Sequence, residues 1–150
     1  MNLYDEFFDV VKALRKVKAR FAVVGGLAMA FYDEPRFTRD IDLLLHSEDE
    51  DVSGAMNKIG YYESAKPWTF KKTPIILHRF TKIEGDDFIS VDILVGKEKR
   101  IDEIIARATE HPWTGGRVRV VSKDDLIWLK KQRGSDQDKV DIRKLKNDKD

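Results

Sequence analysis

Two carboxylates in alternating register, Asp40 and Asp42, open the apolar segment 40–45. On a β-strand, residues two apart point to the same face and lie about 7 Å apart at their Cα atoms. We therefore expect Asp40 and Asp42 to project together, while Ile41 and Leu43 point into a core. Two like charges beside an apolar strand repel each other. A divalent cation would offset them, because Mg²⁺ binds one or two carboxylates together with the phosphate oxygens of a substrate.

A short apolar run and a glycine pair come before these carboxylates. We expect a strand over residues 21–24, followed by a sharp turn at Gly25 and Gly26 that brings backbone N–H groups close to a ligand. A short helix is expected over residues 27–32, and residues 36–39 then lead into the strand of the carboxylates. A plain turn is the alternative interpretation of the glycine pair.

Asp92 is a third acidic residue with apolar neighbours on both sides. It lies in the β-branched segment 88–95, which we expect to be a strand. If this strand lies beside residues 40–45, three carboxylates converge and form a site for one or two Mg²⁺ ions, which could align a triphosphate and polarise an attacking hydroxyl. A solvated strand edge is the alternative for Asp40 and Asp42. The combination and its order favour the metal site.

The rest of the chain predicts a mixed α/β (α+β) protein. We expect one domain, with a catalytic core over about residues 20–95 and a helical part over about residues 97–150. Apolar spacing and capping-box patterns predict helices over residues 3–17, 48–59, 101–108, 122–133 and 138–146. Strands are also expected over residues 61–70, 73–80 and 113–121.

Composition excludes several classes of function. The 28 Lys and Arg residues nearly cancel the 27 Asp and Glu residues, so net charge gives no argument for nucleic-acid binding, although a local basic patch is compatible with it. The chain has no Cys, which removes disulfides, thiolate zinc sites and cysteine nucleophiles. It has no bilayer-spanning apolar stretch and no signal-peptide pattern, so we expect a cytoplasmic protein without membrane contact.

The glycine pair, the D-x-D pattern of Asp40 and Asp42, and the later Asp92 resemble the nucleotidyltransferase signature of the DNA polymerase beta superfamily. The segment VGGLAMAFY…RFTRDIDLLL is most similar to small nucleotidyltransferases of the abortive-infection toxin type, and it also resembles antibiotic nucleotidyltransferases. The resemblance covers residues 21–95 well and residues 125–145 more loosely. It implies a mixed sheet flanked by helices and a transfer of NMP from an NTP that depends on Mg²⁺ (or Mn²⁺).

The resemblance also implies roles for individual residues. Asp40, Asp42 and Asp92 would hold the metal, with Asp92 a candidate general base, and Gly25 and Gly26 would cradle the phosphates. Minimal nucleotidyltransferases carry Gly-Ser followed by Ala-Arg-Gly, whereas this chain reads Gly-Gly-Leu-Ala. Backbone groups and basic side chains must therefore bind phosphate here, which favours the toxin-like and antibiotic-modifying branches.

Three polar residues come directly before the strand of the carboxylates. Arg36, Thr38 and Arg39 are candidates for nucleotide binding, and Arg36 or Arg39 could reach a phosphate. A solvated surface loop is an equally good interpretation of this segment.

A second basic group lies near the C-terminus. The segment LIWLKKQR…DKVDIRKL is similar to toxin-type relatives, which makes Lys130 a candidate for binding the triphosphate and Asp138 or Asp141 a candidate for orienting it. For Arg133 and Asp138 we slightly favour a solvated charged face.

Aromatic and histidine residues carry weaker signals. Trp68 and Phe70, beside Lys71, could stack on a base, although an ordinary amphipathic strand is the preferred interpretation. The histidines show no metal-ligand spacing and are interpreted as structural.

The sequence thus predicts a nucleotidyltransferase that modifies a hydroxyl group of an RNA end such as that of tRNA, of a protein, or of a small molecule. The chain could be the toxin of a toxin–antitoxin pair, with an antitoxin or a second copy as its partner. One alternative is a non-catalytic, regulatory protein of the same fold that binds a partner. Another is an aminoglycoside-type resistance enzyme, which would need an acidic pocket for a polycationic drug.

Overall fold

The computed structural model describes residues 1–32, 39–46, 51–113 and 115–147. Its strands are β1 (Phe21–Val24), β2 (Asp40–His46), β3 (Tyr62–Glu63), β4 (Trp68–Thr69), β5 (Ile76–Glu84), β6 (Asp87–Gly96), β7 (Thr109–Trp113) and β8 (Gly116–Val120). Its helices are α1 (Leu3–Lys16), α2 (Gly25–Phe31), α3 (Val52–Lys58), α4 (Lys99–Arg107), α5 (Lys123–Arg133) and α6 (Asp136–Asn147).

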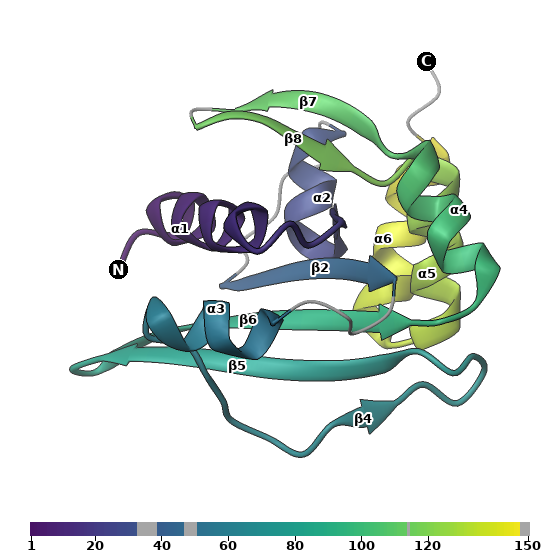
Figure 1. Ribbon diagram of the computed structural model, residues 1–150. Helices are drawn as coiled ribbons and strands as arrows, with labels where there is room; N and C mark the ends of the chain where they lie inside the picture. The colour runs from purple at the N-terminus through teal and green to yellow at the C-terminus, as the bar shows by residue number, and fades with distance from the viewer. Residues whose placement is uncertain (33–38, 47–50, 114, 148–150) are drawn as a thin grey trace.

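Across these described ranges, eight strands form one mixed sheet in the order β3-β5-β6-β2-β1-β8-β7, and β4 pairs with β5. At its centre, β2 lies antiparallel to β1 and parallel to β6. Helices α4, α5 and α6 stand together at the end of the sheet where β2 and β6 finish (Figure 1). The predicted α+β architecture, a mixed sheet flanked by helices, is confirmed.

The central strands are apolar because they are buried. All four residues of β1 are buried, as are five consecutive residues of β2 from Ile41 to Leu45. Strands that are buried on both faces have nearly continuous apolar sequences. Asp42 and Asp92 interrupt these runs, so each puts a carboxylate into a mostly hydrophobic setting.

Two helix boundaries show how capping fixes the ends. Ser122 caps α5, because its hydroxyl accepts a hydrogen bond from the Asp125 N–H at 3.1 Å, as its capping-box pattern predicts. The helix expected from about residue 48 instead begins at Val52, where Asp51 accepts from the Gly54 N–H at 2.9 Å. Ser47, which opens the capping-box pattern Ser-Glu-Asp-Glu before this helix, lies outside the described residues.

Three predicted strands differ from the structure. The expected strands over 61–70 and 73–80 are replaced by the short β3 and β4 and by the longer β5, which runs on to Glu84. Residues 113–121, expected as one short strand, belong to the hairpin β7–β8. Strand β7 was not predicted because TEHPW is polar and contains Pro112, which is tolerated at the edge of a sheet.

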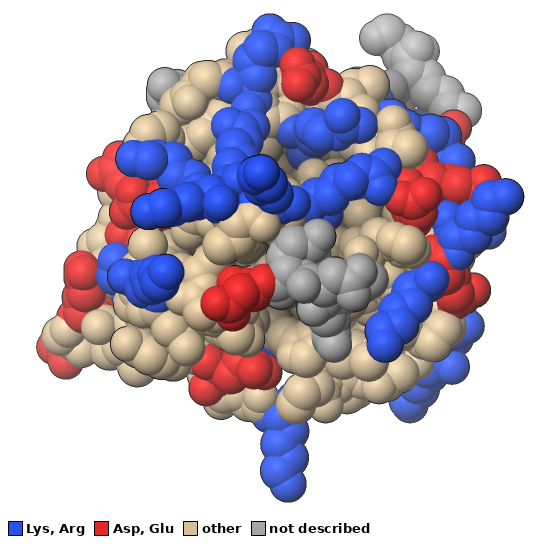
Figure 2. Space-filling model, viewed as in Figure 1, with Lys and Arg blue, Asp and Glu red and all other residues tan. Residues whose placement is uncertain are grey.

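Basic side chains gather on one part of the surface although the net charge is only +1. Figure 2 shows Lys and Arg concentrated over α1 and the β7–β8 hairpin. Arg15 of α1 donates to the Arg117 carbonyl of β8, and Arg15, Arg20 and Arg119 line one hollow. A local basic patch is therefore present. Among the described helices, none has the length and apolar character needed to cross a membrane.

Candidate active site

Asp42 and Gly25 form the tightest contact of the site. Residue 42 pairs with Val24 at the end of β1, so its side chain faces the turn into α2. Gly25 has φ +68°, and a Cβ at this position would lie 1.8 Å from Asp42 Oδ2. Only glycine combines this backbone conformation with room for the carboxylate. The predicted need for a glycine here thus has a second cause besides the turn.

The Asp42 carboxylate is held in an unfavourable environment. The side chain is buried, and in the described part of the chain Oδ1 has no hydrogen-bond partner. Burial, followed by the charge of Asp92 and that of Asp40, raises the pKa of Asp42 to about 7, and Arg133 partly opposes this shift. A buried carboxylate with an unpartnered oxygen is costly unless a cation reaches it.

The three predicted carboxylates lie on adjacent strands. Asp42 stands opposite Asp92 in the parallel ladder of β2 and β6, and Asp40 lies two residues before Asp42 on the same strand. Asp92 is 2% exposed, whereas Asp40 is half-buried. The structure thus brings together the residues that the sequence pattern selects.

Arg79 is a site residue that sequence reasoning missed. Its Nε donates to Asp92 Oδ1 at 2.7 Å and its Nη2 donates to Oδ2 at 2.8 Å. The pair forms because Arg79 on β5 stands directly opposite Asp92 on β6. The turn at Gly85 could have indicated this pair. The hairpin pairs Glu84 with Asp87, and five residues further along each strand the same register pairs residue 79 with residue 92.

The opposite wall of the site comes from the two C-terminal helices. Lys130 is 2% exposed, and its Nζ lies 2.9 Å from Asp141 Oδ2 and 3.8 Å from Asp138 Oδ1. Gln137 Nε2 donates to the other oxygen of Asp141 at 2.8 Å. Lys130 is thus a buried ammonium held by two carboxylates of α6.

Arg133 is held in the same way, and its assignment to a solvated face is wrong. Its Nε and Nη2 each donate to the Asp138 carboxylate at 2.8 Å, and Asp138 is fully buried. Burial alone would raise the pKa of Asp138, but hydrogen bonds from Arg133 and Ser135 keep it below its usual value. Arg133 therefore meets an ionised partner.

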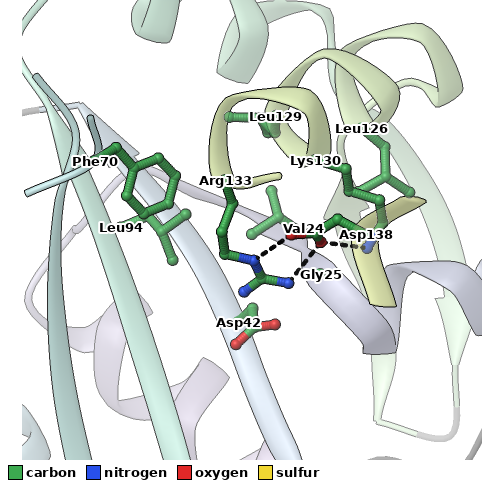
Figure 3. A pocket seen from close by; sticks show the side chains of 10 residues that line it. All are labelled: Val24, Gly25, Asp42, Phe70, Leu94, Leu126, Leu129, Lys130, Arg133 and Asp138. Atoms are coloured by element: carbon green, nitrogen blue, oxygen red, sulfur yellow. Dashed lines mark hydrogen bonds and ion pairs between the residues drawn. The ribbon is translucent and has the colours of Figure 1, made fainter. Parts of the chain in front are cut away.

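These groups line a small, open hollow of about 20 Å³. Figure 3 shows Arg133 reaching from α5 toward Asp42, with Phe70 and Leu94 on the side of the sheet. The lining residues are Val24, Gly25, Asp42, Phe70, Leu94, Leu126, Leu129, Lys130, Arg133 and Asp138. The hollow therefore has mostly apolar walls, the carboxylate of Asp42 at its base, and the cations Lys130 and Arg133 on the opposite side.

Of the remaining predicted phosphate-binding residues, Gly26 follows Gly25 of the site, Arg39 lies elsewhere, and two cannot be placed. Arg39 pairs with Asp87 and donates to the Phe88 carbonyl at 2.6 Å, so its guanidinium is already engaged. Gly26 is buried in the first turn of α2. Arg36 and Thr38 lie outside the described residues.

The donor set suits a hard cation at two of the three carboxylates. Asp42 offers an unpartnered buried oxygen, Asp40 lies on the same strand, and Mg²⁺ prefers carboxylate oxygens. Asp92 fits less well, because Arg79 occupies both of its oxygens. Accordingly, no three His, Asp or Glu side chains among the described residues are arranged to hold a metal ion.

Several solved structures share this fold, and two of them are described as a nucleotidyltransferase and an adenylyltransferase. A nucleotidyltransferase structure from Thermotoga maritima matches with a TM-score of 0.66 and 16% identity, covering 97% of this chain and 93% of that chain. The lincosamide antibiotic adenylyltransferase LnuA, with lincomycin bound, matches at 0.61 and 15%, covering 95% of each chain. The antibiotic-resistance factor ANT(2″)-Ia matches at 0.63 and 16%, covering 97% of this chain and 84% of that chain.

At such low identity these likenesses establish the fold alone. No curated protein sequence matches this chain significantly. The family model described as nucleotidyl transferase AbiEii toxin, type IV TA system, matches residues 11–132, which include both walls of the site as far as α5. The chain therefore belongs to the AbiEii family of nucleotidyl transferase toxins.

Proposed function

We propose that this protein transfers NMP from an NTP to a hydroxyl acceptor in an Mg²⁺-dependent reaction, and that it is the toxin of a toxin–antitoxin pair. The observation that carries the proposal is the buried, unpartnered oxygen of Asp42, which lies against Gly25 and opposite the ordered cations Lys130 and Arg133. The family to which the chain belongs supports both the transfer and an antitoxin partner.

Asp40 and Asp42 would hold the metal. When bound, Mg²⁺ supplies charge that neutralises the triphosphate and favours ionisation of the acceptor hydroxyl. In the transfer, the acceptor oxygen forms a bond to the α-phosphorus and the bond from that phosphorus to the β-phosphate oxygen breaks, so pyrophosphate leaves. Asp92 stays a candidate base for the hydroxyl proton.

The chain's own cations would bind the triphosphate. Lys130 and Arg133 are held by Asp141 and Asp138 before any substrate arrives, so little reorganisation is needed when negative charge develops. The first N–H groups of α2, at Gly25 and Gly26, lack partners within the helix and would donate hydrogen bonds to phosphate oxygens. Phe70 lines the same hollow and excludes water from one side.

The acceptor is the open part of the proposal, because acceptor choice depends on loops and added segments and not on the fold. LnuA was solved with lincomycin, and ANT(2″)-Ia with adenylyl-2″-tobramycin. An RNA end, a protein or a small molecule therefore each needs its own assay. The alternative of a non-catalytic, partner-binding protein predicts no transfer to any of them.

The test is a transfer assay with each of four α-labelled NTPs, Mg²⁺, total RNA and cell lysate. We expect label on one acceptor class, and a loss of more than about 100-fold in Asp42→Asn, because this removes a charge on which transition-state stabilisation depends. Asp86→Asn, an exposed acid in the β5–β6 turn, is the matched control and should retain activity. Equal labelling by Asp42→Asn would refute the assignment of the site.

A further inference from the structure

Arg79 and Asp92 form a bidentate ion pair, and Asp92 is the third carboxylate of the proposed metal site. Both Asp92 oxygens accept from the guanidinium, at 2.7 and 2.8 Å. The Asp92 side chain is 3% exposed, whereas that of Arg79 is 45% exposed. One partner is therefore fixed inside the sheet, while the other keeps nearly half of its side chain exposed to solvent.

The position of Arg79 on the sheet leaves its side chain room to move. Strand β3 pairs with β5 only at Phe80 and Thr81, and β4 pairs only at Ile76 and Leu77. Arg79 lies between these two short ladders, where the Ser64 N–H donates to its carbonyl. The backbone is thus held while the long side chain, nearly half exposed, can turn away.

Charge explains why an arginine stands here. Asp42 and Asp92 are neighbours in register, and Asp40 lies two residues away on the same strand. The hydrogen bonds to Asp92, followed by the charges of all three carboxylates, raise the pKa of Arg79. Arg79 is in direct contact with Asp92, the most deeply buried of these three carboxylates. A divalent ion would perform the same neutralisation, and an ion beside a guanidinium is disfavoured by like charge.

We propose that Arg79 occupies the place of a metal ion at Asp92, so that metal binding to the site requires Arg79 to release this carboxylate. The inference rests on the proposed function, since it concerns the same metal. Its consequence is that the metal alone binds weakly. A metal that arrives with an NTP binds more readily, because the triphosphate offers the released guanidinium a new anionic partner.

The experiment measures Mn²⁺ binding to the full chain by electron paramagnetic resonance, without nucleotide. We expect Arg79→Met to bind Mn²⁺ more tightly than wild type, on the order of tenfold, since two charge-assisted hydrogen bonds no longer compete. Arg107→Met is the matched control. Arg107 forms an equivalent two-pronged pair with Asp125, at 3.1 and 2.9 Å, and its loss should leave Mn²⁺ affinity unchanged.

A double-mutant cycle separates competition from a general change in charge. The gain from Arg79→Met should disappear when Asp92 is replaced, so Asp92→Asn and Arg79→Met/Asp92→Asn should bind Mn²⁺ equally. If Arg79→Met fails to fold, Arg79→Lys keeps the charge but not the fork, and a gain of about two- to threefold is expected.

Two results would overturn the inference while leaving the proposed function intact: an unchanged or lower Mn²⁺ affinity in Arg79→Met, or an equal gain with and without Asp92. Absence of binding in wild type and in all variants, including the control, would instead remove the metal site and the inference together. Where wild type binds Mn²⁺, loss of binding in Asp42→Asn locates the ion at the proposed site. The metal site then stands even if the inference about Arg79 fails.

Discussion

Gly25 and Asp42 are in a contact so close that a Cβ on the glycine would lie 1.8 Å from the carboxylate oxygen Oδ2. The first helical turn after β1 and the carboxylate of β2 therefore occupy one shared space. The glycine serves two purposes here, since it turns the chain at φ +68° and leaves room for the acidic group.

Gly25→Ala should lower both stability and activity. We expect a loss of about 3 kcal/mol or more in the free energy of unfolding, because a disfavoured φ is combined with a steric clash. Gly85→Ala is the matched control: Gly85 has φ +62°, but a Cβ there meets nothing within 4 Å, so about 1–2 kcal/mol is expected. Urea unfolding measures both variants, and equal losses would argue against the clash.

Asp42→Asn should stabilise the metal-free protein in a pH-dependent way. The folded pKa of about 7 exceeds the ordinary 3.8, so the folded state binds the proton more tightly than the unfolded state. Wild type therefore loses stability as the pH rises from about 4 to about 7, by up to about 4 kcal/mol, and Asp42→Asn does not. Unfolding in EDTA near pH 5 and near pH 8 tests this, and an equal gain at both values would contradict it.

Mg²⁺ should offset part of this cost in wild type. An ion that binds only the folded state at about ten times its Kd adds about 1.4 kcal/mol, which raises the Tm by about 2–5 °C for a chain of this length. Thermal unfolding near pH 8 with Mg²⁺ or EDTA measures the shift. Asp42→Asn should show none, and a shift that survives this substitution would place the ion elsewhere.

Lys130→Met should be far more damaging than the neighbouring Lys131→Met. Lys130 is buried against Asp141, which has no exposed surface, whereas Lys131 is exposed. Breaking a buried pair costs about 3–5 kcal/mol, because a charge remains inside without its partner. Adding Asp141→Asn to Lys130→Met should recover part of the stability in urea unfolding. No recovery would show that Lys130 acts through packing alone.

The sheet and its acidic edge could be predicted from local patterns. The apolar runs around Asp42 and Asp92 indicate buried strands, and alternation places Asp40 with Asp42 on one face. The start of α5 followed from the capping pattern at Ser122. These features depend on residues close together in sequence, which is why a single chain reveals them.

The cationic wall could be predicted only in part, for a physical reason. Helix α6 carries charges around its whole circumference, so its sequence resembles a solvated helix. Asp138 and Asp141 are buried because Arg133 and Lys130 of α5 neutralise them, and this pairing exists only after the two helices pack. Arg79 was missed because its role depends on register across a hairpin.

The pairing of α5 with α6 also determines when the site is completed. During synthesis, β1, β2 and β6 emerge from the ribosome first, and with them all three carboxylates. The residues that fix Lys130 and Arg133 belong to α6, which emerges later, and domains fold as units as the chain grows. A nascent chain thus carries the three carboxylates before Lys130 and Arg133 are held in place, which happens only once α6 has docked.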